Sequence, residues 1–117
     1  MFEVFADDDD ILMQDFTDEN GLPQDISTAT LLMTVRDQKT KAVIFTKSST
    51  SISEIEKLVP AGGGAAGSDG KTYIYISGDD TKNLKGAYEY DIQITFANST
   101  VVTLDKDFLV VKEDISA

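Results

Sequence analysis

The chain has 117 residues, 41% of them hydrophobic and 26% charged, which is the size and composition of one globular domain. It contains no Cys, His or Trp, so disulfide bonds, Ser-His-Asp or Cys-His catalysis and ordinary zinc sites are excluded. Its 21 acidic residues against 10 basic ones give a net charge of −11, which disfavours nucleic acids and anionic membranes and favours a basic protein partner.

The N-terminal region combines a candidate strand at residues 2–6 with four consecutive aspartates, Asp7 to Asp10. It has neither the basic nor the long apolar region of a secretory signal, and no apolar run approaches the roughly 20 residues that span a bilayer. Carboxylates suit calcium, but four consecutive side chains do not converge on one ion, and EF-hand spacing is missing. The run therefore predicts a solvated acidic segment, with a calcium site as the minor alternative.

Alternating polar and apolar residues predict strands through the first third of the chain. Residues 11–17 form a short candidate, and residues 30–36 (TLLMTVR) form a clearer one. The polar turn at residues 37–41 then leads into residues 42–47 (AVIFTK), the expected hairpin partner. The inward-facing residues of the clearer strand are expected to be Leu31, Met33 and Val35.

Residues 52–59 (ISEIEKLV) have a different spacing of apolar residues. Ile52, Ile55 and then Leu58 or Val59 recur at helical intervals behind Ser51, which is a favourable helix cap. This pattern predicts a short helix before Pro60, with an irregular crossover as the alternative.

The stretch AAGSDGKT, Ala65 to Thr72, fits a relaxed phosphate-loop pattern. A phosphate loop needs a strand before it and a helix after it, so that helix amides point at the anion. Here a Gly-rich stretch precedes the match and residues 71–77 (KTYIYIS) follow it as an expected strand. We therefore expect no nucleotide or other cofactor, and a flexible loop over residues 60–70 that turns at Asp69-Gly70.

Residues 78–86 (GDDTKNLKG) predict a connection between two sheets. Asp79 or Asp80 is expected to cap a single helical turn, and Leu84 to fill the core. The two carboxylates also suggest acid-base catalysis, but no third group or apolar pocket is predicted beside them, so capping is favoured.

The clearest alternation in the chain lies at residues 88–96 (YEYDIQITF). After it, Asn98-Ser99-Thr100 matches a glycosylation sequon in a predicted polar turn, and residues 100–104 and 107–111 predict a last strand or a bulged pair of strands. The expected inward residues are Tyr88, Tyr90, Ile92, Ile94 and Phe96, and the expected outward ones are Glu89, Asp91, Gln93 and Thr95.

About seven short strands with at most one short helix predict an all-β fold, an immunoglobulin-like antiparallel β-sandwich, as a single domain over residues 1–117. Tyr88 begins the best strand just after the connection between sheets. It is therefore a candidate for the tyrosine corner of such sandwiches.

Two segments resemble a recurrent pattern of tailed-phage and prophage proteins. In the first half, the pattern covers the acidic run, the turn Thr17-Asp18-Glu19-Asn20-Gly21-Leu22-Pro23 and the continuation Asp25-Ile26-Ser27-Thr28-Ala29-Thr30. In the second half, it covers DGKTYIYISGDDTKNLKGAYEYDIQIT, residues 69–95. The chain is similar to the immunoglobulin-like N-terminal domain of phage upper-baseplate proteins and related small tail-associated proteins.

The resemblance implies a non-enzymatic structural subunit of a phage or prophage particle, in the tail, baseplate or head-tail connector. Such a subunit is assembled in the bacterial cytoplasm, resides in the virion, and binds other phage structural proteins or copies of itself. No catalytic, cofactor-binding or metal-binding residues are carried over. The alternatives are an acidic decoy that imitates DNA and blocks a host DNA-binding protein, and an immunoglobulin-like cell-surface adhesion module.

Overall fold

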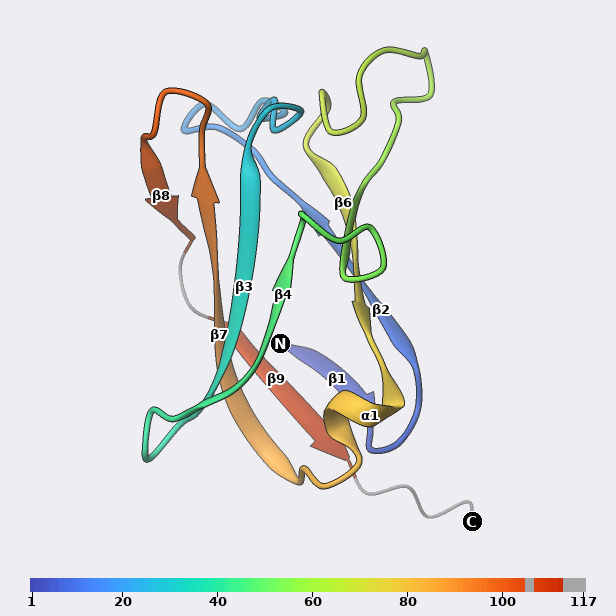
Figure 1. The fold of residues 1–117 in the computed structure, drawn as a ribbon, viewed down its shortest axis with the longest axis vertical. Coiled ribbons are helices and arrows are strands. Elements are labelled where there is room, and N and C mark those ends of the chain that lie inside the picture. Colours follow the sequence, from blue (N-terminus) through green and yellow to red (C-terminus); the bar gives the residue numbers. More distant parts are fainter. Residues whose placement is uncertain (105–106, 113–117) are drawn as a thin grey trace.

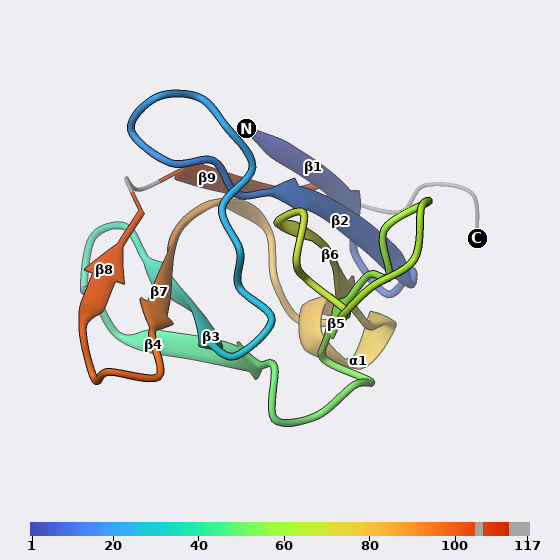
Figure 2. The same ribbon diagram turned by 90° about the horizontal axis from the view of Figure 1, so that it is seen from above.

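The computed structural model describes residues 1–104 and 107–112, and these form an all-β, sandwich-like fold of two facing sheets (Figure 1). Figure 2 shows β2, β5 and β6 on one side and β3, β4, β7 and β8 on the other. The first sheet has the order β1 (Phe2–Phe5), β9 (Asp107–Lys112), β7 (Gly86–Thr95), β3 (Thr30–Asp37) and β4 (Val43–Ser48), and β8 (Val101–Thr103) also pairs with β7. The second sheet has the order β2 (Asp10–Asp15), β6 (Lys71–Ile76) and β5 (Ile55–Lys57). The predicted all-β class is confirmed.

The described residues contain nine strands, more than the seven or so expected, and one strand pair is parallel. The count rises because the closing segment is divided into β8 and β9, the bulged pair that was one of the alternatives, and because β5 was not expected. The parallel pair is β1 with β9. After β1 the chain crosses to the other sheet to form β2, which leaves β1 free to lie alongside the last strand in the same direction.

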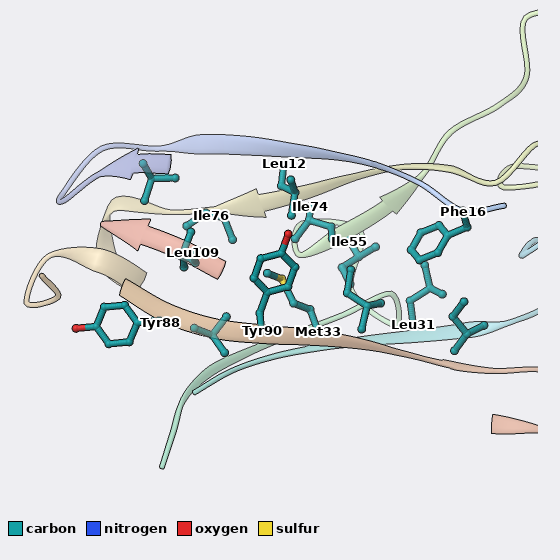
Figure 3. Packing of buried hydrophobic residues seen from close by; sticks show 14 of the residues in the cluster. Leu12, Phe16, Leu31, Met33, Ile55, Ile74, Ile76, Tyr88, Tyr90 and Leu109 are labelled. Carbon is teal, nitrogen blue, oxygen red and sulfur yellow. The ribbon is translucent and has the colours of Figure 1, made fainter. Parts of the chain in front are cut away.

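The core is built from the inward faces that the alternation predicted (Figure 3). In the pairing of β3 with β7, Leu31 lies opposite Ile94, Met33 opposite Ile92 and Val35 opposite Tyr90, and all six are buried. The second sheet supplies the opposite wall of the core from Leu12, Ile55, Ile74 and Ile76.

Two residues of the outer face of the first sheet are more buried than the alternation predicted. Thr34 and Glu89 lie on the outer face as expected, yet each is less than a tenth exposed. The Nζ atom of Lys41 lies 2.9 Å from Oε1 of Glu89 and covers this carboxylate. The predicted face is therefore right, and the stem of Lys41 accounts for the lost exposure of Glu89.

The helix predicted over residues 52–59 is wrong. The carbonyl of Ser51 accepts hydrogen bonds from the amides of Glu54 and Ile55, which closes a turn, and β5 then pairs with β6. Ile55 is buried while Ile52 is 72% exposed, so the residues at helical spacing do not share a buried face. Backbone pairing with the edge of β6 replaces the expected helical hydrogen bonds.

The Gly-rich segment at residues 60–70 enters β6 directly, as its context predicted. Its second half is held by backbone hydrogen bonds: Gly67 donates to Leu58 at 2.8 Å and accepts from Ile26 at 3.0 Å. Gly70 has φ of +77° and accepts from the amide of Phe16 at 2.8 Å. The left-handed backbone conformation and the close approach of the backbone at Phe16 both favour glycine here.

The single helical turn predicted after β6 is present as α1 (Gly78–Thr81), but its N-cap is neither Asp79 nor Asp80. Ser77 is the N-cap, and its side chain accepts from the amide of Asp80. Asp80 completes a capping box, since its Oδ2 atom accepts from the amide of Ser77 at 2.8 Å. Ser77 was overlooked because it also ends the alternating pattern of the preceding strand.

Tyr88 forms the predicted corner: its hydroxyl donates to the carbonyl of Lys85 and accepts from the amide of the same residue, both at 3.2 Å. We expect Tyr88→Phe to lower the free energy of unfolding by about 1 kcal/mol, because the ring packing stays and the hydrogen bonds are lost. Chemical denaturation followed by circular dichroism measures this. An unchanged midpoint would show that the corner bonds contribute nothing to stability.

Candidate functional site

The outer face of the first sheet has its charges paired locally. Arg36 Nη1 lies 3.0 Å from Asp91 Oδ2, Lys41 contacts Glu89, and Lys112 Nζ lies 2.7 Å from Glu3 Oε2. Exposed apolar side chains, among them Phe5, Leu32 and Phe108, lie between these ion pairs on the same face.

The outer face of the second sheet has a continuous apolar strip. Ile11 lies opposite Tyr75 and Met13 opposite Tyr73 in the pairing of β2 with β6, and we call these four residues the β2–β6 outer face. Ile11 and Met13 are 44% and 69% exposed. The two tyrosine rings meet edge to face, with their centres 6.4 Å apart. An apolar strip of neighbouring aliphatic and aromatic side chains is typical of a surface that another protein covers.

Tyr75 is oriented from the neighbouring strand. Its hydroxyl donates to Oε1 of Glu56 at 2.5 Å. This hydrogen bond to a carboxylate raises the pKa of Tyr75 above its ordinary value. Tyr75 therefore presents a fixed ring to the outer face, with a neutral polar tip.

A groove of about 610 Å³ continues this face at the end of β6. Four separate segments form it: the start of β2, the end of β4, the turn before β5 and the end of β6. Its lining residues are Asp9, Asp10, Ile11, Lys47, Ile52, Ser53, Tyr75, Ile76 and Ser77.

Lys47, the one cation of this lining, is paired within the fold. Its Nζ atom lies 2.6 Å from Oδ2 of Asp80, and its side chain is 10% exposed. The same Nζ atom lies 5.7 Å from the centre of the Phe45 ring. Because Asp80 offsets this charge, the net charge that the groove presents comes from Asp9 and Asp10.

The pairing of Asp80 predicts a pH effect on stability. Burial alone would raise the pKa of Asp80, but the hydrogen bonds from Lys47 and from the amide of Ser77 outweigh it and lower the pKa below the ordinary 3.8. A carboxyl with a lowered folded-state pKa contributes stability above its unfolded pKa and loses that contribution as pH falls through the folded pKa. We expect Asp80→Asn to be less stable than the parent at pH 7 and the difference to shrink below pH 3.8. Urea denaturation of both proteins across pH measures this, and a constant difference would contradict it.

Two aspartates of the acidic run accept hydrogen bonds from backbone amides. Asp9 Oδ1 accepts from the amide of Gly78, and Asp10 Oδ1 accepts from the amide of Ile11, both at 2.8 Å. The Asp7 amide donates to the hydroxyl of Thr81. Within residues 1–104 and 107–112, no three acidic side chains are grouped so as to hold a metal ion.

The other motifs of the sequence lie apart from the groove or only at its edge. Lys71 is exposed and is the first residue of β6. A strand, and not a helix, therefore follows the phosphate-loop pattern. Asn98 lies in the predicted turn, where its side chain accepts from the amide of Thr100 at 3.0 Å. Asp79 is fully solvated at 93% side-chain exposure, while Asp80 points to Lys47. The two carboxylates therefore do not form a catalytic pair.

No protein-family model matches the chain, and no curated protein matches it significantly. The described part of the chain holds no helix with the length and apolar character to cross a membrane.

Sequence reasoning missed both the β2–β6 outer face and the groove. A signal was present: in ILM and YIYI, residues 11–13 and 73–76, apolar side chains occupy both faces of a strand. An apolar outer face follows from that pattern once the inner face is known.

Proposed function

We propose that the chain is a non-enzymatic structural subunit of a bacteriophage or prophage particle, in the tail, baseplate or head-tail connector, that acts through protein contacts. The observation that carries the proposal is the β2–β6 outer face, where the exposed Ile11 and Met13 lie beside two tyrosine rings and form an apolar strip. The resemblance of residues 7–37 and 69–95 to phage tail-associated proteins gives the kind of assembly.

An immunoglobulin-like fold is part of the same proposal. The order β2–β6–β5 in one sheet facing β1–β9–β7–β3–β4 in the other supports it, as does the corner formed by Tyr88. Domains of this type pack through sheet faces or accept an added strand at an edge. The β2–β6 outer face and the neighbouring edge of β2 suit such contacts.

The acidic residues favour a structural role over an acidic decoy. Asp18 accepts from two amides of its own turn, and amide hydrogen bonds from Ser27 and Thr40 lower the pKa of Asp25 and of Asp37. These carboxylates fix turns, and others form the ion pairs of the first sheet. A decoy needs carboxylates spaced along one surface like phosphates.

Co-assembly tests the proposal. The chain is produced with the structural proteins encoded beside it, and purified particles are analysed by mass spectrometry. We expect Met13→Glu to reduce incorporation at least tenfold, because it places a charge on the apolar strip. Val43→Glu is the matched control, since Val43 is 56% exposed on β4 of the other sheet. A monomer that ignores all of these proteins and binds a host DNA-binding protein tightly would favour the decoy instead.

A further inference from the structure

We infer that the groove at the end of the β2–β6 outer face binds an arginine or lysine side chain from an extended segment of a partner protein, with apolar side chains on the same face of that segment. This inference rests on the proposed function, because the partner is a neighbouring structural protein of the same particle.

The carboxylates of the groove supply the preference for a cation. Asp9 and Asp10 each use Oδ1 to hold a backbone amide, so both side chains are positioned by the fold. A carboxylate accepts several hydrogen bonds, and the Oδ2 atoms keep capacity for a cationic donor. Lys47 does not satisfy them, because its Nζ atom is bound to Asp80 at 2.6 Å.

The walls of the groove suit the aliphatic stem of such a side chain. Ile11 and Ile52 are 44% and 72% exposed, and Tyr75 stands beside them with its ring held by Glu56. Long basic side chains bury their methylene groups on apolar surfaces and keep the charged end at a polar group. A guanidinium also stacks well on a tyrosine ring.

The strip formed by Met13 and Tyr73 continues from the groove along the sheet. An extended segment has side chains of one face at every second residue, so a basic residue in the groove places apolar neighbours over this strip. The arrangement therefore selects a basic residue with apolar residues two and four positions away, in place of a single charge.

A second copy of this chain is a poorer occupant. Each copy has a charge of −11, and a symmetric contact through the groove brings Asp9 and Asp10 of both copies together. Unpaired like charges at an interface cost binding energy and slow association. A basic partner would instead gain binding energy from these charges and associate faster.

Titration of the isotopically labelled chain with three peptides, followed by amide chemical shifts, tests the inference. The probe is a five-residue peptide with arginine at its first position, leucine at its third and fifth, and serine at the other two, so that the arginine and both leucines point to one face. One control replaces leucine by serine, and the other replaces arginine by glutamate. We expect the probe to shift amides at residues 9–13, 52–53 and 73–77, and each control to bind at least tenfold more weakly.

Three variants locate the site. Asp10→Asn and Ile11→Ser are each expected to weaken probe binding about tenfold, since they remove a charge-assisted contact or an apolar wall. Glu19→Gln removes the same charge from the turn at the opposite end of the molecule (Figure 1) and is expected to leave binding unchanged. Thermal unfolding checks that Ile11→Ser remains folded.

Shifts scattered over the acidic surface, equal losses for Asp10→Asn and Glu19→Gln, or no shifts at all would overturn the inference. The proposed function fails separately. Incorporation into particles that survives Ile11→Ser and Asp10→Asn would leave the structural role standing and remove only the groove. Probe binding at the groove without incorporation into any particle would support the groove as a binding site and contradict the structural role.

Discussion

Replacement of Gly70 by alanine is expected to destabilise the fold by about 3 kcal/mol or more. Two costs add at this position. The φ angle of +77° is strained for any residue with a side chain, and an added Cβ atom would lie 2.4 Å from the carbonyl oxygen of Phe16 and 2.8 Å from that of Gln24. Both contacts are with backbone atoms, so relief requires the backbone around residues 16 and 24 to move.

Two other glycines separate these costs. Gly21 has φ of +79° with nothing within 4 Å of an added Cβ atom, so Gly21→Ala is expected to cost about 1 to 2 kcal/mol from the backbone alone. Gly62 has neither constraint, and Gly62→Ala is expected to change stability by less than about 0.5 kcal/mol. Guanidinium denaturation of the three variants gives the comparison. Equal effects at Gly70 and Gly21 would mean that the close approach at Gly70 is absent in solution.

Truncation of Ile74 to alanine is expected to cost about 2 to 5 kcal/mol. Ile74 is fully buried on the central strand of the second sheet, where it pairs with Leu12 of β2 and Ile55 of β5. Its loss leaves a cavity in the wall that faces β3 and β7 (Figure 3).

Ile52→Ala is the matched control for this truncation, because the same side chain is 72% exposed there. It is expected to change stability by less than about 0.5 kcal/mol. Calorimetry of both variants measures the difference. A large loss at Ile52 with a small one at Ile74 would mean that the faces of the second sheet are inverted.

The faces of the long strands were predictable from the sequence because their alternation has one wet side. In β7, Ile92 and Ile94 alternate with Gln93 and Asp91, so only one register buries apolar groups. The corner at Tyr88 was predictable for a related reason, since a tyrosine at the start of such a strand lies next to the turn that it can bond.

The segment before Pro60 was not predictable in the same way. Its apolar residues fit a helix as well as a turn followed by a short strand, and the edge of β6, which decides the outcome, lies elsewhere in the sequence. The parallel pairing of β1 with β9 likewise depends on segments about a hundred residues apart. Local patterns contain no information on such pairings.

The groove was also not predictable from local sequence patterns. Asp9 and Asp10, Ile52, and Tyr75 come from three segments that only the sheet pairing brings together. The aspartates were recognised as an acidic run, but the apolar walls beside them were assigned to other roles, Ile52 to a buried helical face. A sequence pattern that is apolar on both faces of β2 and β6 predicts a covered outer face, and it does not say what covers it.

The parallel pair of β1 and β9 also has a mechanical consequence. Phe2 and Lys112 lie at opposite ends of this ladder, which runs from the pairing of Phe2 with Leu109 to that of Phe5 with Lys112. Tension between these two residues pulls one strand along the other and loads all of the hydrogen bonds together, whereas an antiparallel pair pulled at adjacent ends opens one bond at a time. The chain therefore resists stretching in shear, at its terminal strands, before its core is exposed.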